Sequence, residues 1–414
     1  MAGPLRQLRQ GLGLLGPGIA VAATGVGAGD LISGTAAGAQ FGTALLWAAA
    51  FSALLKFALN EGIARWQLAT GTTVLEGWCA HLGRPFQYYF LIYLIGWSFM
   101  VGGGLISACG IAGHTMFPQL SVSTWAIIHS LVGAALVLWG RYALFERAMK
   151  VLIALMFFSF VASAWVLRPE WSVLLEGLLL FQMPPGSAKS TLSVIGGVGG
   201  SLTMLCYGYW IRESGRGGPE WLRPTRIDLG VAYSLTGFFG MAVILLSAQM
   251  HPELAKGSQI VMGLAGRLEE AMGPVGRWAL YLGFWGAVAS SLLGVWQGIP
   301  YLFADFVGLF KGLNPEARAA IVQPGSRYYR AFLAFLTLAP MTLLLFDKPV
   351  GNVVAYTVVG ALFMPFLAGA LLYMNTRRAW VGALRNGWLA IVLLSAALLV
   401  FAYLSVNGVV EGAG

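Results

Sequence analysis

Apolar segments of about twenty residues recur along the whole chain, and short polar stretches separate them. Each of these segments is long and apolar enough for one helical crossing of a lipid bilayer. The eleven segments cover residues 17–40, 43–66, 86–113, 121–140, 148–167, 190–211, 228–249, 277–306, 329–346, 350–374 and 387–407. The pattern therefore predicts an all-α polytopic membrane protein.

Glycine interrupts two of the apolar segments. In the first segment Gly25, Gly27 and Gly29 alternate and Asp30 follows, and the sixth segment contains the run 196–203, Gly-Gly-Val-Gly-Gly-Ser-Leu-Thr. Each glycine costs a helix roughly 1 kcal/mol relative to alanine, and a charge at the bilayer centre costs at least ~2.5 kcal/mol. A pair of broken helices in corresponding halves of a chain indicates the binding site of a transporter.

The spacing of the two breaks also predicts an internal repeat. We expect one transmembrane transporter domain built of a first repeat at 1–170, a second repeat at 185–375 and an extra helix at 386–408. Because each repeat contains five spans, an odd number, the second must be inverted relative to the first.

Composition supports a membrane protein. The chain is 58% hydrophobic and 10% charged, with a mean hydropathy of +0.76, whereas soluble domains are about 25% charged. The net charge of +9 does not indicate nucleic-acid binding, because the basic residues lie singly at the ends of spans. The three cysteines, an odd number, imply no disulfide framework, and the four histidines lack the spacing of metal ligands.

The distribution of Lys and Arg predicts the orientation. Eighteen basic residues fall on the side of the N-terminus, six fall on the other side, and Lys56 lies within the second span. Basic loops stay in the cytoplasm, so we expect a cytoplasmic N-terminus and, with eleven spans, an external C-terminus. The membrane expected is a bacterial inner or plasma membrane, and the protein is expected to be monomeric.

The chain resembles the Nramp family of divalent-metal transporters over nearly its whole length, most weakly in spans three to five. The resemblance implies the LeuT fold, an inverted 5+5 helix repeat around a central ion, with an eleventh helix added. The matching positions are Gly16–Gly18 through Asp30, Gly38–Gly42, Leu45–Trp47, Asn60–Ala64, Thr70-Gly71, Ala289–Ser291, Gln297-Gly298 and Met364–Phe366.

Several family motifs are altered. The first-helix motif Asp-Pro-Gly-Asn corresponds to Gly27–Asp30, so the first metal-binding carboxylate is missing. The sixth-helix motif Met-Pro-His corresponds to Thr203–Leu205, a tenth-helix glutamine corresponds to Thr357, and the stretch 96–113 lacks the acids linked to proton movement. In losing the sulfur ligand the chain resembles Nramp-related magnesium transporters, and uptake driven by the membrane potential is expected.

Asp30 is the first candidate for a substrate or ion ligand, because an acid within a membrane span is functional by default. We expect it to face the central cavity and to bind a cation or a proton. A structural role is compatible with this, since Asp is a favoured N-cap and a half-helix is expected to begin at Leu31.

The remaining ligand candidates in the breaks are Thr24, Gly27, Gly200, Ser201 and Thr203, with Thr203 the second candidate metal ligand after Asp30. Thr357 in the tenth span is a further candidate for binding the substrate or ion. Unwound carbonyls need partners within a membrane, and an ion can supply one. The alternative is close helix packing through small residues.

Three further residues are candidates for coupling or gating. Lys56 can pair with Asp30, replace a second cation or titrate as a proton carrier; alternatively it pairs with Glu61 or extends toward the cytoplasm. Gln297 can face the cavity from the eighth span, and Tyr207 can either pack or stack on a substrate.

Two functions remain open. Carboxylate, hydroxyl and carbonyl oxygens favour a divalent cation of the Mg²⁺ or Mn²⁺ class, moved by alternating access. The loss of the family's metal-ligand side chains favours instead a small organic solute, such as an amino or organic acid, whose carboxylate is attracted to the helix N-termini. No cofactor is expected, and no nucleophile–base pair or phosphate loop indicates an enzyme.

Overall fold

The computed structural model describes residues 18, 26–140, 151, 154–162, 164–165, 170–250 and 259–413, with the backbone alone over 408–413. Over these residues the chain is helical and contains no strand. Nine helical runs in the described part are long and apolar enough to cross a membrane. Apolar side chains such as Ile92, Phe238 and Leu399 are 61–73% exposed on their outer surfaces, as expected for helices that face lipid.

The first two predicted spans form one helical run that turns back on itself. It comprises a π-helical turn, η1 (Gly29–Ser33), then α3 (Gly34–Phe41), η2 (Gly42–Leu45) and α4 (Leu46–Thr70). Gly42 has a φ of +60° at the turn, a conformation that favours glycine. Gly29 and Lys56 both lie against the break in the sixth span, so the chain returns to the same depth.

The other spans follow the hydropathy pattern. They are α6 (Gly83–Met116), α7 (Val122–Trp139), α10 (Ala188–Gly197) with η3 (Leu202–Leu205) and α11 (Cys206–Glu213), α12 (Leu222–Ser247), α14 (Pro274–Phe310), α16 (Arg327–Leu338) with η6 (Ala339–Phe346), α17 (Pro349–Ala361) with α18 (Met364–Thr376), and α20 (Trp388–Ala413). The predicted fifth span lies partly outside the described residues.

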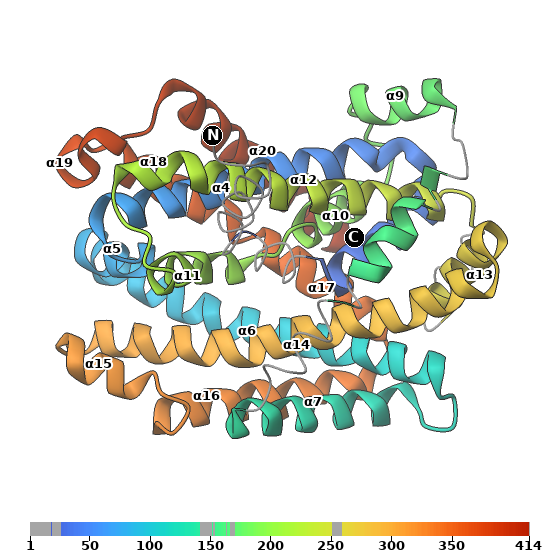
Figure 1. Cartoon of the computed structure of the whole chain (residues 1–414), viewed down its shortest axis with the longest axis horizontal. Coiled ribbons are helices and arrows are strands. Elements are labelled where there is room, and N and C mark those ends of the chain that lie inside the picture. Colours follow the sequence, from blue (N-terminus) through green and yellow to red (C-terminus); the bar gives the residue numbers. More distant parts are fainter. Residues whose placement is uncertain are drawn as a thin grey trace, which may run out of the picture.

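The short elements lie at the two ends of the bundle (Figure 1). They are α5 (Val74–His81), α9 (Trp171–Leu179), η4 (Pro219–Trp221), α13 (Gln259–Met272), α15 (Pro315–Ile321), α19 (Arg378–Val381) and η7 (Gly382–Leu384). In Figure 1, α5, α15 and α19 lie at the left end and α9 and α13 at the right end. After the seventh span, α13 buries one apolar side made of Ile260, Leu264 and Leu268.

The tenth span contains an interruption that the hydropathy pattern does not show. It separates at Leu362 and Phe363 into α17 and α18, and Pro365 lies in the first turn of α18. Proline is tolerated in the first turn of a helix, where its missing N–H would have no partner. α10 packs against α17, α4 and η1, so the interior of the bundle is formed where the first, second, sixth and tenth spans meet.

Candidate functional site

The sixth span is broken, as its glycine run predicts. α10 ends at Gly197, residues 198–201 are unwound, and the helix resumes through η3 into α11. Gly199 and Gly200 have φ values of +80° and +79°. L-residues rarely adopt this conformation, so glycine at both positions allows the chain to turn here without strain.

The first span is also interrupted, and Asp30 stands just inside its outer half. The helix begins with η1 at Gly29, and the Gly27 N–H donates to Asp30 Oδ2 at 3.1 Å. The predicted start at Leu31, with Asp30 as N-cap, is therefore wrong: Asp30 belongs to the first turn and reaches back to an N–H that has no helical partner. The inner half of this span, with Thr24, lies outside the described residues.

The two breaks touch through glycine. A Cβ atom added to Gly197 would lie 3.0 Å from the backbone of Gly29, and one added to Gly196 would lie 2.2 Å from the Thr357 carbonyl oxygen of α17. Three spans therefore meet at a distance that only glycine permits.

We expect Gly196→Ala to lower the thermal unfolding temperature of the purified protein, because its methyl group would push α10 away from α17. Overpacking of this kind costs about 1–3 kcal/mol. Gly369→Ala in α18 is the matched control, since an added Cβ there meets no atom within 4 Å. Equal stability of the two variants would contradict the close crossing.

A cavity of about 50 Å³ lies between the two breaks. Four predicted site residues, Gly27, Gly200, Ser201 and Thr203, line it. The other lining residues are Ala28, Gly29, Trp97, Val101, Leu105, Gly196, Gly197, Cys206, Trp210, Ser291, Gly294, Val295 and Tyr356. Among the described residues, the lining contains hydroxyl and thiol groups and three large aromatic side chains, but no carboxylate.

The polar groups of this cavity are partly unpaired. The Trp97 indole N–H donates to Ser201 Oγ at 3.1 Å. Ser291 Oγ is buried and has no hydrogen-bond partner among the described residues. Buried hydroxyls normally have partners, so Ser291 has bonding capacity available for something in the cavity.

Asp30 is buried beside the cavity but is not one of its lining residues. Its side chain is 1% exposed, and Oδ1 has no hydrogen-bond partner in the described part of the chain. The neighbouring residue Gly29 lines the cavity, and successive helical side chains point about 100° apart. The carboxylate therefore does not border the cavity that Gly29 lines.

The hydrogen bonds of Lys56 go to the sixth span, and its charge interacts with that of Asp30. Its ammonium donates to the carbonyl oxygens of Gly196, Val198 and Gly200. The predicted alternative that it pairs with Glu61 is wrong, because Glu61 forms ion pairs with Arg65 and Arg226. Glu61 and Arg65 lie four residues apart on α4, a spacing at which helical side chains meet.

The other predicted candidates are spread around the cavity without lining it. The Thr357 hydroxyl contacts Ser193 Oγ at 2.7 Å and Ser33 Oγ at 3.4 Å, which joins α17, α10 and η1 through buried hydroxyls. The Gln297 side chain is exposed. Tyr207 is fully buried in an apolar cluster, and its hydroxyl has no hydrogen-bond partner among the described residues.

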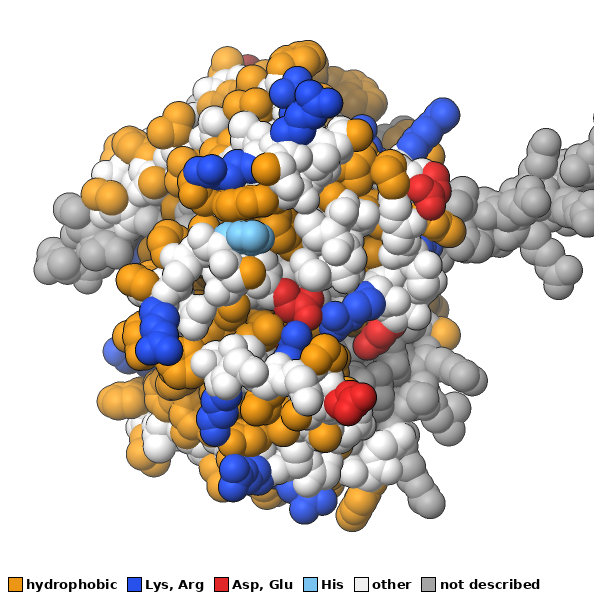
Figure 2. Space-filling view, turned by 90° about the vertical axis from the view of Figure 1, so that its left-hand side faces the viewer, with side chains coloured by type: hydrophobic (Ala, Val, Ile, Leu, Met, Phe, Trp, Pro, Cys, Tyr) orange, Lys and Arg blue, Asp and Glu red, His pale blue; other side chains and the backbone are white. Residues whose placement is uncertain are grey.

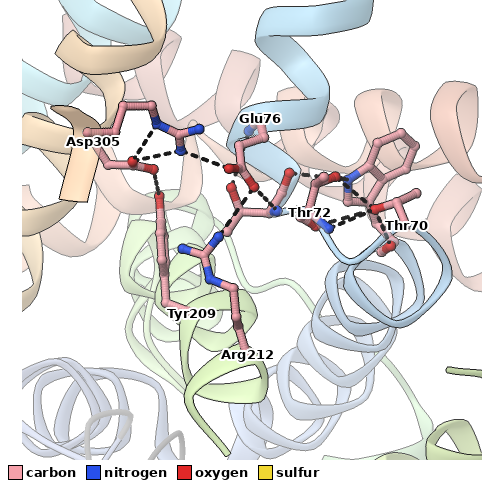
Figure 3. A network of polar contacts seen from close by, with 9 residues as sticks. Thr70, Thr72, Glu76, Tyr209, Arg212 and Asp305 are labelled. Carbon is pink, nitrogen blue, oxygen red and sulfur yellow. Dashed lines mark hydrogen bonds and ion pairs between the residues drawn. The ribbon is translucent and has the colours of Figure 1, made fainter. Parts of the chain in front are cut away.

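A network of charged side chains holds the far end of α11 (Figure 3). Arg318 Nη2 lies 2.8 Å from both Glu76 Oε1 and Asp305 Oδ1. The Tyr209 hydroxyl donates to Asp305 Oδ2 at 2.7 Å, and Arg212 lies 3.6 Å from Glu76. Asp305 is therefore part of a network that ties the inner half of the broken sixth span to α5, α14 and α15.

Glu76 is held in this network in its charged form. Burial alone would raise the pKa of its carboxyl, but the Thr73 N–H and the guanidinium groups of Arg318 and Arg212 together lower the pKa below its ordinary value of 4.5. Thr73 and Glu76 also form a capping box at the start of α5.

We therefore expect the stabilisation from Glu76 to be complete above about pH 5 and to be lost as the pH falls through the lowered pKa. The measurement is the difference in unfolding temperature between the parent and Glu76→Gln from pH 7 to 3. The difference should stay constant down to about pH 5 and then shrink. A difference that grows on acidification would contradict this assignment.

Sequence reasoning missed the aromatic and hydroxyl groups that come from other spans. Trp97, Ser291 and Tyr356 belong to α6, α14 and α17 and to no broken-helix pattern. Cys206 could have been predicted as a lining residue from the sequence, because it begins α11 shortly after the predicted break. The described residues contain no group of three His, Cys, Asp or Glu side chains that could hold a metal ion.

Comparison with known proteins shows similarity over nearly the full length. The model of the natural resistance-associated macrophage protein-like (Nramp) family matches residues 18–411. The divalent metal cation transporter MntH of Mycobacterium leprae is 23% identical over 95% of this chain and 92% of its own. MntH of Mycobacterium tuberculosis is 25% identical over the same shares of the two chains.

Solved structures share the fold. A manganese transporter of Eremococcus coleocola, crystallised with an aromatic bis-isothiourea compound, aligns with a TM-score of 0.71 at 18% identity, over 98% of this chain and 87% of its own. MhsT in complex with L-phenylalanine aligns with a TM-score of 0.59 at 14% identity, over 97% of this chain and 98% of its own.

Proposed function

Because this chain belongs to the Nramp family, we propose that it is a secondary transporter that carries a divalent cation of the Mn²⁺ or Mg²⁺ class. The expected LeuT-type arrangement of membrane helices is confirmed by the shared fold. Integral membrane transport, rather than enzyme catalysis, is the function of this family. The cation is the substrate, and no cofactor is part of the proposal.

The observation that carries the proposal is the cavity between the two breaks. Hydroxyl groups of Ser201, Thr203 and Ser291 and the thiol of Cys206 are available at its lining, and the Ser291 hydroxyl has no protein partner in the described part. Oxygen ligands suit Mg²⁺ and Mn²⁺, whereas a thiol suits softer ions than Mg²⁺. We therefore place Mn²⁺ ahead of Mg²⁺.

We assign Asp30 an indirect role in this proposal. Its carboxylate is buried outside the cavity lining. It contributes negative charge through a region of low polarity, where a charge acts over longer distances than in water. The pocket, by contrast, would bind the ion through neutral donors and through water retained by the ion. Binding of this kind is weak enough to permit release on the far side.

We further propose that residues 1–170 and 185–375 are inverted repeats that rock against each other around this cavity. Basic side chains outnumber acidic ones on the end of the molecule that carries α5, α15 and α19 (Figure 2). By the positive-inside rule this end faces the cytoplasm. The N-terminus then lies in the cytoplasm and the C-terminus outside.

The test is uptake into liposomes that contain the purified protein and a trapped metal indicator. We expect Mn²⁺ and, more slowly, Mg²⁺ to enter under an inside-negative potential. Thr203→Val removes one donor without changing the shape of the side chain, and we expect about tenfold slower uptake, the equivalent of ~1.4 kcal/mol. Thr236→Val on α12 is the control, because the Thr236 hydroxyl bonds only to its own helix at Ala232.

A small organic solute is the second candidate, favoured by one observation. The cavity has aromatic walls at Trp97, Trp210 and Tyr356 and no acidic side chain in its lining. Aromatic faces suit an organic solute, as in the apolar pockets that bind small molecules. Uptake of amino or organic acids by the same liposomes, without any flux of Mn²⁺ or Mg²⁺, would replace the cation proposal with this one.

A further inference from the structure

Three backbone carbonyl groups of the broken sixth span converge on one ammonium group. Lys56 Nζ lies 2.8 Å from the oxygen of Gly196 and 2.5 Å from the oxygens of Val198 and Gly200. Lys56 is completely buried. Lys56 lies in the middle of α4, and its four-carbon stem extends from there, so the ammonium group at the break belongs to a neighbouring helix.

These contacts complete the hydrogen bonding of the unwound segment. The last four carbonyls of a helix have no partners within it. Here Val194 accepts from the Val198 N–H, Gly197 accepts from the Gly200 N–H at 3.4 Å, and Ile195 accepts from the Ser52 hydroxyl at 2.7 Å. Lys56 donates to the carbonyls of Gly196, Val198 and Gly200, and Val198 also accepts from the Ser52 hydroxyl at the longer distance of 3.4 Å.

The arrangement requires a cation. A protonated lysine has three N–H donors and no acceptor, which matches three converging carbonyl oxygens. A neutral amine would have two donors and would turn its lone pair toward the third oxygen. Unwound carbonyls in broken transporter helices are otherwise used to coordinate free cations.

The backbone is shaped for this convergence. The positive φ angles of Gly199 and Gly200 allow the carbonyls of alternate residues, 196, 198 and 200, to turn toward one point. A Cβ atom on Gly199 would lie 2.9 Å from the ring of Tyr233 and 3.4 Å from Lys56 Cδ. The segment therefore closes around the lysine stem as well as around its charge.

We propose that Lys56 is a tethered cation: its ammonium permanently fills a carbonyl site in the sixth span that would otherwise bind a small free cation. Removing the side chain beyond Cβ should open a site for ammonium, methylammonium or Na⁺. In the parent chain this position is closed to any coupling ion. The inference concerns the break itself and holds whichever substrate the cavity carries.

The experiment is thermal unfolding of purified Lys56→Ala in detergent, with added salts of fixed total ionic strength. In choline chloride, whose cation is too large for the site, we expect a lower unfolding temperature than for the parent. Methylammonium or ammonium chloride should restore at least half of the loss, in a saturable manner, and should leave the parent unchanged. Transport is not measured, so a failed flux assay would not affect the result.

Two variants control for volume and for general loss of hydrogen bonds. Lys56→Met keeps the stem but fills the space without charge, so it should not respond to methylammonium. Ser52→Ala removes a neutral donor to the same segment and should not respond either. Lys56→Ala as stable as the parent in choline, or an equal response of Lys56→Met, would overturn the proposal.

Poor folding of Lys56→Ala is itself informative. In that case Lys56→Gln, which can supply only part of the hydrogen bonding, takes its place in the same titration. If both variants aggregate, membranes are extracted in parallel with choline and with methylammonium chloride. Recovery of folded protein only in methylammonium supports the tethered cation, and aggregation in both contradicts it.

Discussion

Lys56→Met is expected to destabilise the protein by about 3–5 kcal/mol, as observed when one member of a buried charge pair is removed. The substitution removes the Lys56 donor from the carbonyls of Gly196, Val198 and Gly200, of which Val198 keeps a 3.4 Å contact with the Ser52 hydroxyl. Each buried carbonyl left without a donor costs ~1–3 kcal/mol. The substitution also leaves Asp30, which is buried and whose charge interacts with that of Lys56, without a countercharge. Thermal or SDS-induced unfolding of the purified variant measures the loss.

A double-mutant cycle with Asp30→Asn separates these two contributions. The asparagine oxygen can still accept from the Gly27 N–H, so the single substitution should have a smaller effect than Lys56→Met. In the double variant the uncompensated charge is gone, and part of the loss should return as a coupling energy of about 0.5–3 kcal/mol. The Lys56→Met variant and the double variant both lack the contacts between Lys56 and the carbonyl groups, so this part of the loss remains in both.

Asp305→Asn provides the comparison for the cycle. Asp305 shares no contact partner with Lys56 in the described part of the chain, since it binds Arg318 and Tyr209. Its effect should add to that of Lys56→Met without coupling. A coupling energy near zero for Asp30 and Lys56 would mean that the two charges are independent of each other.

The broken helices are predictable from sequence because their cause is local. Alternating glycines in the first span and the run 196–203 in the sixth weaken helices that hydropathy otherwise requires. The break in the tenth span was missed because its apolar run continues through Leu362 and Phe363. Pro365 was the available signal, and a proline commonly stands in the first turn of a new helix.

The direction in which each side chain points was not predictable, because neighbouring helices determine it. Gly29 lines the cavity while Asp30, one residue later, does not. For Lys56 the sequence left several partners open. The choice among them depended on where the carbonyls of residues 196–200 turn, which is a property of the folded sixth span and of two left-handed glycines.

Arg318→Met is expected to open the α5 and α15 end of the cavity and to expose Cys206 to thiol reagents. Arg318 is the bridge between Glu76 and Asp305. Without it the two carboxylates lose their shared cation, and only Arg212 remains beside Glu76. Asp305, which accepts from the Tyr209 hydroxyl, then loses its own partner Arg318, and we expect α11 to become free to move. α11 begins at Cys206, which lines the cavity. Motion of this half-helix should therefore change how accessible the Cys206 thiol is to reagents.

The measurement is the rate at which a small maleimide modifies Cys206 in a chain that also carries Cys79→Ser and Cys109→Ser. We expect at least a tenfold increase with Arg318→Met, the equivalent of ~1.4 kcal/mol in the closed-to-open equilibrium. Arg327→Met is the matched control: Arg327 lies at the same end and contacts Tyr328, with no acidic partner among the described residues. If both arginine variants react at the parent's rate, the charge network stabilises the fold without closing the pathway, and the gate must lie elsewhere along α11.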